Sequence, residues 1–213
     1  MSDDAPVVGT PSRPHPKYVR VARDYLRAAQ LVDAEYKHGD IRFQMPSLAL
    51  LCHGTELALK SMLIANPGAA KKAGHKLHEA FDMLSGQPAA DHVFAEAENA
   101  MRDLLAQKTR TYVVESDSGE AADISDSGED LQIVARDCSQ SFEVSDLLAF
   151  WGRRHATDGG MFRYPGWERD RRYMAWTADG LIDAGALALG AWATALVAAL
   201  EKRLRAPETS EQS

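Results

Sequence analysis

The chain has 213 residues, 45% of them hydrophobic, which is enough for one domain with a substantial core. Its formal net charge of −7 argues against a general polyanion-binding protein, because such proteins usually carry a basic balance. The only cysteines, Cys52 and Cys138, exclude a disulfide framework and a four-cysteine zinc site, so a reducing cytoplasm is the expected location.

Both ends of the chain are predicted to be disordered tails around a single helical domain over residues 17–205. Residues 1–16 begin acidic and carry four prolines before any periodic segment, the opposite of a basic region followed by an apolar signal core. Residues 206–213 form the second predicted tail.

Four helices are predicted in the first half of the chain, because apolar residues recur there at three-to-four spacing. The predicted ranges are Tyr18–His38, about Pro46–Ala65, about His75–Leu84 and Ala89 to about Lys108. Asn66-Pro67-Gly68 is interpreted as a turn, because proline lacks an amide hydrogen and glycine accepts the backbone that follows. Short connections of this kind predict antiparallel neighbours.

An insert at about residues 109–145 interrupts the helical pattern. Thr111–Val114 and Leu131–Ala135 are short β-prone runs, so a small hairpin or an irregular excursion is predicted. Between them an acidic repeat, SDSGEAADI followed by SDSGEDLQI, occupies Ser116–Ile133. Its spacing does not satisfy the calcium-loop pattern, which favours a solvated loop over a metal site.

The last third is predicted to contain a short helix at Val144–Trp151 and a long closing helix at Ala178–Arg205. Within the latter, Leu181–Leu200 is long enough to span a membrane but is largely alanine and is interrupted by Asp183, which favours a buried bundle helix. The predicted fold class is therefore mainly all-α, an up-and-down bundle of about five helices with a small irregular or β-hairpin insert.

Four stretches carry a resemblance to a known family: YLRAAQLVDAEY, HGTELALKSMLIANPG, GHKLHEAFDML and the later FRYPG. Together they resemble the HEPN superfamily (higher eukaryotes and prokaryotes nucleotide-binding), best from about Tyr18 to Leu84. The resemblance implies a helical bundle, commonly a homodimer, often in toxin-antitoxin, antiviral or RNA-processing systems. It thus implies RNA, a cognate antitoxin or another protein as partner. Neither a membrane nor a cofactor is expected.

Many members of that family look like metal-independent ribonucleases, whose signature is an arginine followed four to six residues later by a histidine. A base must take the 2′-hydroxyl proton and a fixed cation must stabilise the phosphorane. This chain lacks that spacing, and its nearest approximation is Arg153-Arg154-His155, where adjacent helical residues diverge by about 100°.

The leading interpretation is therefore a non-catalytic or divergent member that binds nucleic acid or a protein partner in a defence or regulatory system. The runner-up is a metal-independent endoribonuclease that uses Arg153 or Arg154 with His155. A purely structural interaction module is the third class.

His53, Glu56 and Lys60 recur at i, i+3 and i+7, so they line one side of the second predicted helix, where Glu56 and Lys60 can pair. A polar seam between helices is favoured over a catalytic site, which would need a pocket. His75 and His78 with Glu79 lack a third ligand and an orienting shell, so no metal site is predicted.

The segment from residue 162 to 176 interleaves aromatic and arginine side chains, the mixture that stacks on bases and binds phosphates. The alternative is that its aromatics anchor a loop while its arginines pair with nearby acids. The candidate nucleic-acid-binding residues are Arg163, Tyr164, Trp167, Arg169, Arg171, Arg172 and Tyr173.

Overall fold

The computed structural model describes residues 13–37, 44–64, 67–117, 143–156 and 181–206. These described residues form seven helices and no strand, which confirms the predicted all-α bundle. The helices are α1 (Pro16–Lys37), α2 (Gln44–Leu63), α3 (Pro67–Ala73), α4 (Leu77–Leu84), α5 (Pro88–Asp117), α7 (Val144–Ala156) and α9 (Leu181–Arg205).

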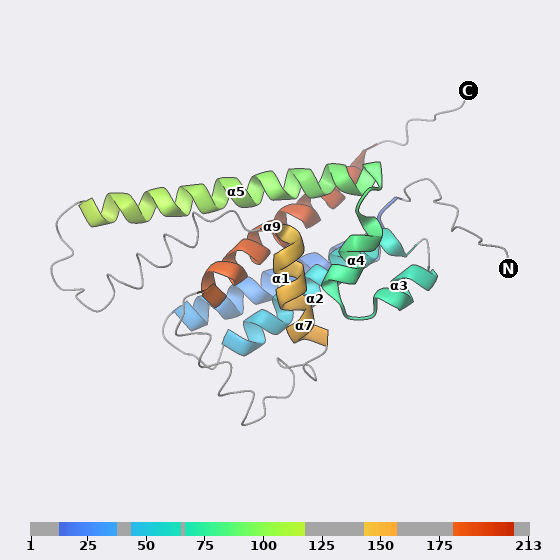
Figure 1. Ribbon diagram of the computed structural model, residues 1–213, viewed down its shortest axis with the longest axis horizontal. Coiled ribbons are helices and arrows are strands. Elements are labelled where there is room, and N and C mark those ends of the chain that lie inside the picture. The colour runs from blue at the N-terminus through green and yellow to red at the C-terminus, as the bar shows by residue number, and fades with distance from the viewer. Residues whose placement is uncertain (1–12, 38–43, 65–66, 118–142, 157–180, 207–213) are drawn as a thin grey trace.

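The helices are arranged around α2 and α9. Helix α1 packs along α2, α5 packs along α9, and α9 also contacts α1, α2 and α7. The short helix α4 lies between α2 and α7, and the far end of α5 extends beyond the rest of the bundle (Figure 1). This arrangement places α2 at the centre, with different neighbours on its different faces.

Helices α1 and α2 approach closely at Gly54. A Cβ atom at this position would lie 2.8 Å from Leu26 Cδ2 and 3.2 Å from the Ala22 carbonyl oxygen. The hydroxyl of Ser47 donates to the carbonyl of Ala29 at 3.2 Å, which links the same two helices by a buried polar contact. This close approach favours a glycine in the middle of α2, despite its low helix propensity.

The core is sealed by aromatic side chains from four helices. Trp192 of α9 is fully buried and lies 6.2 Å from Phe81 of α4 and 5.9 Å from Phe94 of α5, measured between ring centroids. Trp151 of α7 is 1% exposed. Burying one such side chain contributes about 1.5–3 kcal/mol, so these residues stabilise the packing of the helices that carry them.

Helix α9 is the one described helix that is long and apolar enough to cross a membrane by length and composition, over Gly185–Arg205. Half of that window is buried inside the bundle. Trp192, Leu196 and Leu200 are fully covered by other helices. The buried half of this window is thus part of the core of the bundle.

Two features of the connections differ from the sequence prediction. Pro67 does not simply end a turn but begins the short helix α3, in keeping with the preference of proline for a first helical position. Gly74, with a positive φ of 56°, follows the end of α3, and α4 starts only at Leu77. His75 consequently lies in the turn between α3 and α4 rather than on a helix.

The predicted strand at Thr111–Val114 is wrong, because α5 continues through it to Asp117. Each residue added to an existing helix gains a backbone hydrogen bond to the residue four before it. This gain outweighs the weak β preference of the residues themselves. The other predicted strand, Leu131–Ala135, and the acidic repeat beyond Asp117 lie outside the described residues.

The end of the predicted N-terminal tail is attached to the bundle. The amide of His15 donates to the carbonyl of Ser61 at 2.9 Å, and the guanidinium of Arg13 donates to the carbonyl of Leu204. Helix α1 begins at Pro16. Residues on the N-terminal side of the predicted domain boundary at residue 17 thus contact the bundle, while residues 1–12 and 207–213 lie outside the described part.

Candidate functional site

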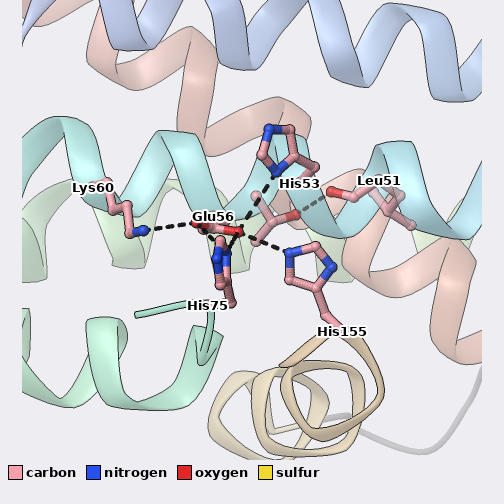
Figure 2. A network of polar contacts seen from close by, with 7 residues as sticks. Leu51, His53, Glu56, Lys60, His75 and His155 are labelled. Atoms are coloured by element: carbon pink, nitrogen blue, oxygen red, sulfur yellow. Dashed lines mark hydrogen bonds and ion pairs between the residues drawn. The ribbon is translucent and has the colours of Figure 1, made fainter. Parts of the chain in front are cut away.

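Four basic or ionisable side chains converge on the carboxylate of Glu56, and we call these five residues the Glu56 cluster. Helix α2 supplies His53, Glu56 and Lys60, the turn before α4 supplies His75, and α7 supplies His155. Figure 2 shows the basic side chains arranged around the Glu56 carboxylate. Segments separated by as many as 99 residues of sequence therefore meet at a single functional group.

Each oxygen of the Glu56 carboxylate has its own partners. Oε1 accepts a hydrogen bond from Lys60 Nζ at 2.7 Å, and Oε2 lies 2.8 Å from His155 Nε2. His75 Nδ1 is 3.1 Å from both oxygens. His53 Nδ1 is 3.6 Å from Oε2, which is close enough for an ion pair but too far for a hydrogen bond.

The cluster is buried at its centre and open at one side. The side chains of Glu56 and His155 are 4% and 3% exposed, whereas those of Lys60, His53 and His75 are 17%, 30% and 54% exposed. Solvent can therefore reach His53 and His75 directly, but it reaches the carboxylate and His155 only past them.

Burial alone would raise the pKa of the Glu56 carboxyl. The contacts with its basic neighbours, of which that with His155 is the largest, lower this pKa, and the net result lies well below the usual range for a glutamate. Glu56 is thus an ionised carboxylate inside the fold. A buried charge of this kind must be paired, and the surrounding basic groups pair it.

A second close approach brings α7 into the cluster. A Cβ atom on Gly152 would lie 3.1 Å from the amide nitrogen of Leu77 and 3.3 Å from His78 Nδ1. His155 follows Gly152 by three residues, so it projects from nearly the same face of α7. The glycine allows α7 to lie against the start of α4, and this contact positions His155 beside Glu56.

The sequence prediction found part of this cluster. The expected pair between Glu56 and Lys60 is present, and both residues lie on the side of α2 that also carries His53. The prediction did not connect His75 or His155 with them, because no spacing along the chain relates three separate segments. The sequence offered one signal of this contact: Gly152, because a glycine in a helix allows another element to approach closely.

The other predicted site residues have different surroundings. Arg153 is exposed, while His155 points into the cluster, so these neighbours project in different directions. The side chain of Arg154 lies outside the described part.

Glu79 pairs with Lys76, the residue just before α4, rather than with a histidine. All seven candidate nucleic-acid-binding residues, from Arg163 to Tyr173, also lie outside the described residues.

Fold and site together define an α-helical bundle built around a buried, ionised glutamate with basic neighbours. The chain was compared with protein-family models, with curated proteins and with solved structures, and none of them matches it. The resemblance to the HEPN superfamily therefore remains a prediction from the quoted stretches of sequence.

Proposed function

We propose that this protein is a HEPN-like helical module that binds RNA without cleaving it. The observation that carries the non-catalytic part of the proposal is the position of His155. Its side chain is 3% exposed, and its Nε2 lies 2.8 Å from Glu56. The histidine that a ribonuclease site at Arg153-Arg154-His155 would use as its base is thus engaged inside the bundle.

General-base catalysis requires the base to lie within hydrogen-bond reach of the proton that it removes. The His155 side chain is 3% exposed, so neither of its ring nitrogens can meet a ribose hydroxyl unless α7 moves away from α2 and α4. This burial supports a structural use of His155 and weakens the alternative of a metal-independent endoribonuclease.

The RNA-binding part rests on the sequence between residues 162 and 176, where arginine and aromatic side chains alternate. Such a mixture binds single strands by stacking on bases and pairing with phosphates. The resemblance to HEPN proteins extends the proposal to a cytoplasmic homodimer in a defence, toxin-antitoxin or regulatory system, with a protein partner such as a cognate antitoxin.

The test is binding of labelled single-stranded RNA to the purified protein at two salt concentrations. We expect salt-sensitive binding that a triple variant, R169A/R171A/R172A, loses. If each arginine contacts one phosphate, the slope of log affinity against log salt falls by roughly 2 in the variant. The charge-matched control is K71A/K72A/R102A, which removes three exposed cations from the described helices and should leave binding unchanged.

Absence of salt-sensitive binding, or equal loss in the two triple variants, would contradict an RNA site in this segment. Cleavage is assayed on the same RNA, once in EDTA and once with added divalent metal. We expect intact RNA in both. Cleavage that disappears in His155→Ala, with the variant still folded by circular dichroism, would instead establish the endoribonuclease.

A further inference from the structure

Three residues of the Glu56 cluster have the composition of a metal site. His53 Nδ1, a carboxylate oxygen of Glu56 and a ring nitrogen of His155 all lie within 4.8 Å of one another. We propose that His53, Glu56 and His155 bind a divalent cation of the zinc class, which joins α2 to α7. The proposal is independent of RNA binding and replaces the expectation from sequence that no metal site is present.

The donor set matches the chemistry of zinc. Two imidazole nitrogens and one carboxylate oxygen form a ligand set that zinc uses in proteins, with a water in the fourth position. Imidazole ligands also suit cobalt and nickel, whereas magnesium and calcium prefer oxygen ligands. The set therefore selects a borderline transition metal over the hard cations.

The spacing of the ligand atoms also fits. Tetrahedral ligands at about 2.0–2.1 Å from zinc lie about 3.3 Å from one another. Around Glu56 Oε2, the distances are 2.8 Å to His155 Nε2 and 3.6 Å to His53 Nδ1. The ring nitrogens of His53 and His155 lie within 4.8 Å of each other. A cation that replaces the hydrogen bond between His155 and Glu56 would therefore draw the two imidazole rings closer together.

His53 supplies an independent observation. Its Nδ1 atom is buried and makes no hydrogen bond within the described part of the chain. This ring is held edge-on by Tyr25 of α1, with 4.5 Å between the ring centroids. An unsatisfied buried nitrogen beside a carboxylate needs an explanation, and a bound cation provides one.

The surroundings hold the carboxylate in place for this role. Lys60 occupies Oε1 at 2.7 Å, which leaves Oε2 directed toward the two histidines (Figure 2). His75 Nδ1, 3.1 Å from both oxygens, lies on the exposed side of the cluster. Groups that orient a metal ligand in this way commonly affect metal affinity by about 10–100-fold.

The site would connect elements that are distant in sequence. His53 and Glu56 are three residues apart on α2, a spacing that metal-binding helix bundles also use, and His155 lies near the end of α7. A cation at this point cross-links α2 and α7 and so stabilises the folded state by binding to it preferentially.

The experiment is calorimetric titration of the full-length, chelator-treated protein, free of any histidine tag, with zinc chloride. We expect one zinc per chain and a rise in melting temperature on zinc addition. Cobalt in place of zinc should give the visible absorption of a tetrahedral complex. His53→Ala should weaken binding by more than about 100-fold, since it removes a ligand, and His75→Ala by about 10–100-fold.

His92→Ala is the matched control, because His92 is an exposed histidine on α5, outside the cluster. It should retain one zinc per chain with unchanged affinity. His155→Ala is informative only if it folds, so the partly exposed His53 carries the test. Failure of the wild-type protein to bind one zinc, or equal binding by wild type and His53→Ala, would overturn the proposal.

Discussion

Helix α2 is packed by opposite chemistry on its two sides. On one side Gly54 allows the backbone of α1 and the Leu26 side chain to approach within about 3 Å of where a Cβ would lie. On the other side Glu56, about 200° further round the helix, is surrounded by basic side chains from α2, α7 and the turn before α4. The comparison shows that close packing positions α2 against α1, whereas charge pairing positions α2 against α7.

The two sides should respond differently to substitution. On the polar side, the energy lies in partners that become unpaired when one member is removed. On the apolar side, the stabilising energy comes from close packing of side chains and backbone. There the damaging change is the addition of a methyl group, which has no room.

The largest effect is expected from Glu56→Ala. This change leaves His155 and Lys60 without the carboxylate that pairs them, and loss of one partner of a buried charge pair destabilises by about 3–5 kcal/mol. Urea unfolding followed by circular dichroism measures the loss. A destabilisation below about 1 kcal/mol would show that the cluster contributes little to the fold.

Gly54→Ala tests the apolar side. The new methyl group would meet Leu26 and the Ala22 carbonyl, so we expect α1 to shift and stability to fall by about 1–3 kcal/mol. The matched control is Gly190→Ala in α9, where a Cβ would have its nearest neighbour, Leu51 Cδ1, at 3.9 Å.

In that control, alanine should stabilise by up to about 1 kcal/mol through its higher helix propensity. Thermal melts of the two variants should therefore move in opposite directions. Movement of both to lower temperature would mean that Gly190 lies against something beyond the described residues, such as a second copy of the chain.

Gly152→Ala tests both kinds of packing at once. It adds volume at the contact between α7 and α4, and this contact positions His155 beside Glu56. The added Cβ would lie 3.1 Å from the amide nitrogen of Leu77, so α7 has to move away from α4. We expect a loss of about 1–3 kcal/mol. Displacement of His155 should also weaken zinc binding, which calorimetry on the folded variant would detect. Unchanged zinc affinity would show that His155 is positioned by other contacts.

The smallest effect is expected from Lys202→Ala. Lys202 Nζ lies 3.3 Å from Glu96 Oε1, but the two side chains are 75% and 41% exposed. Solvent screens such a pair, so the free energy of unfolding should change by less than about 0.5 kcal/mol. A larger loss in urea unfolding would show that the link between α5 and α9 depends on charge as well as on aromatic packing.

The fold class followed from local pattern, and the errors have local causes. Apolar residues at helical spacing located α1, α2 and most of α5, because a helix in a bundle must bury one continuous face. The run Thr111–Val114 was misread as a strand, since residue preference alone does not register the helical turns before it. Pro67 was read as a stop although it also begins α3.

For the candidate site, the sequence determined which side of α2 is polar, since the spacing of His53, Glu56 and Lys60 fixes their common face whatever packs against it. Only the tertiary structure decided that His75 and His155 complete the cluster, because their approach depends on how α4 and α7 dock. That docking depends on the absence of a side chain at Gly152, which lets α7 lie close to α4. The spacing of apolar residues along the chain does not specify which element packs there.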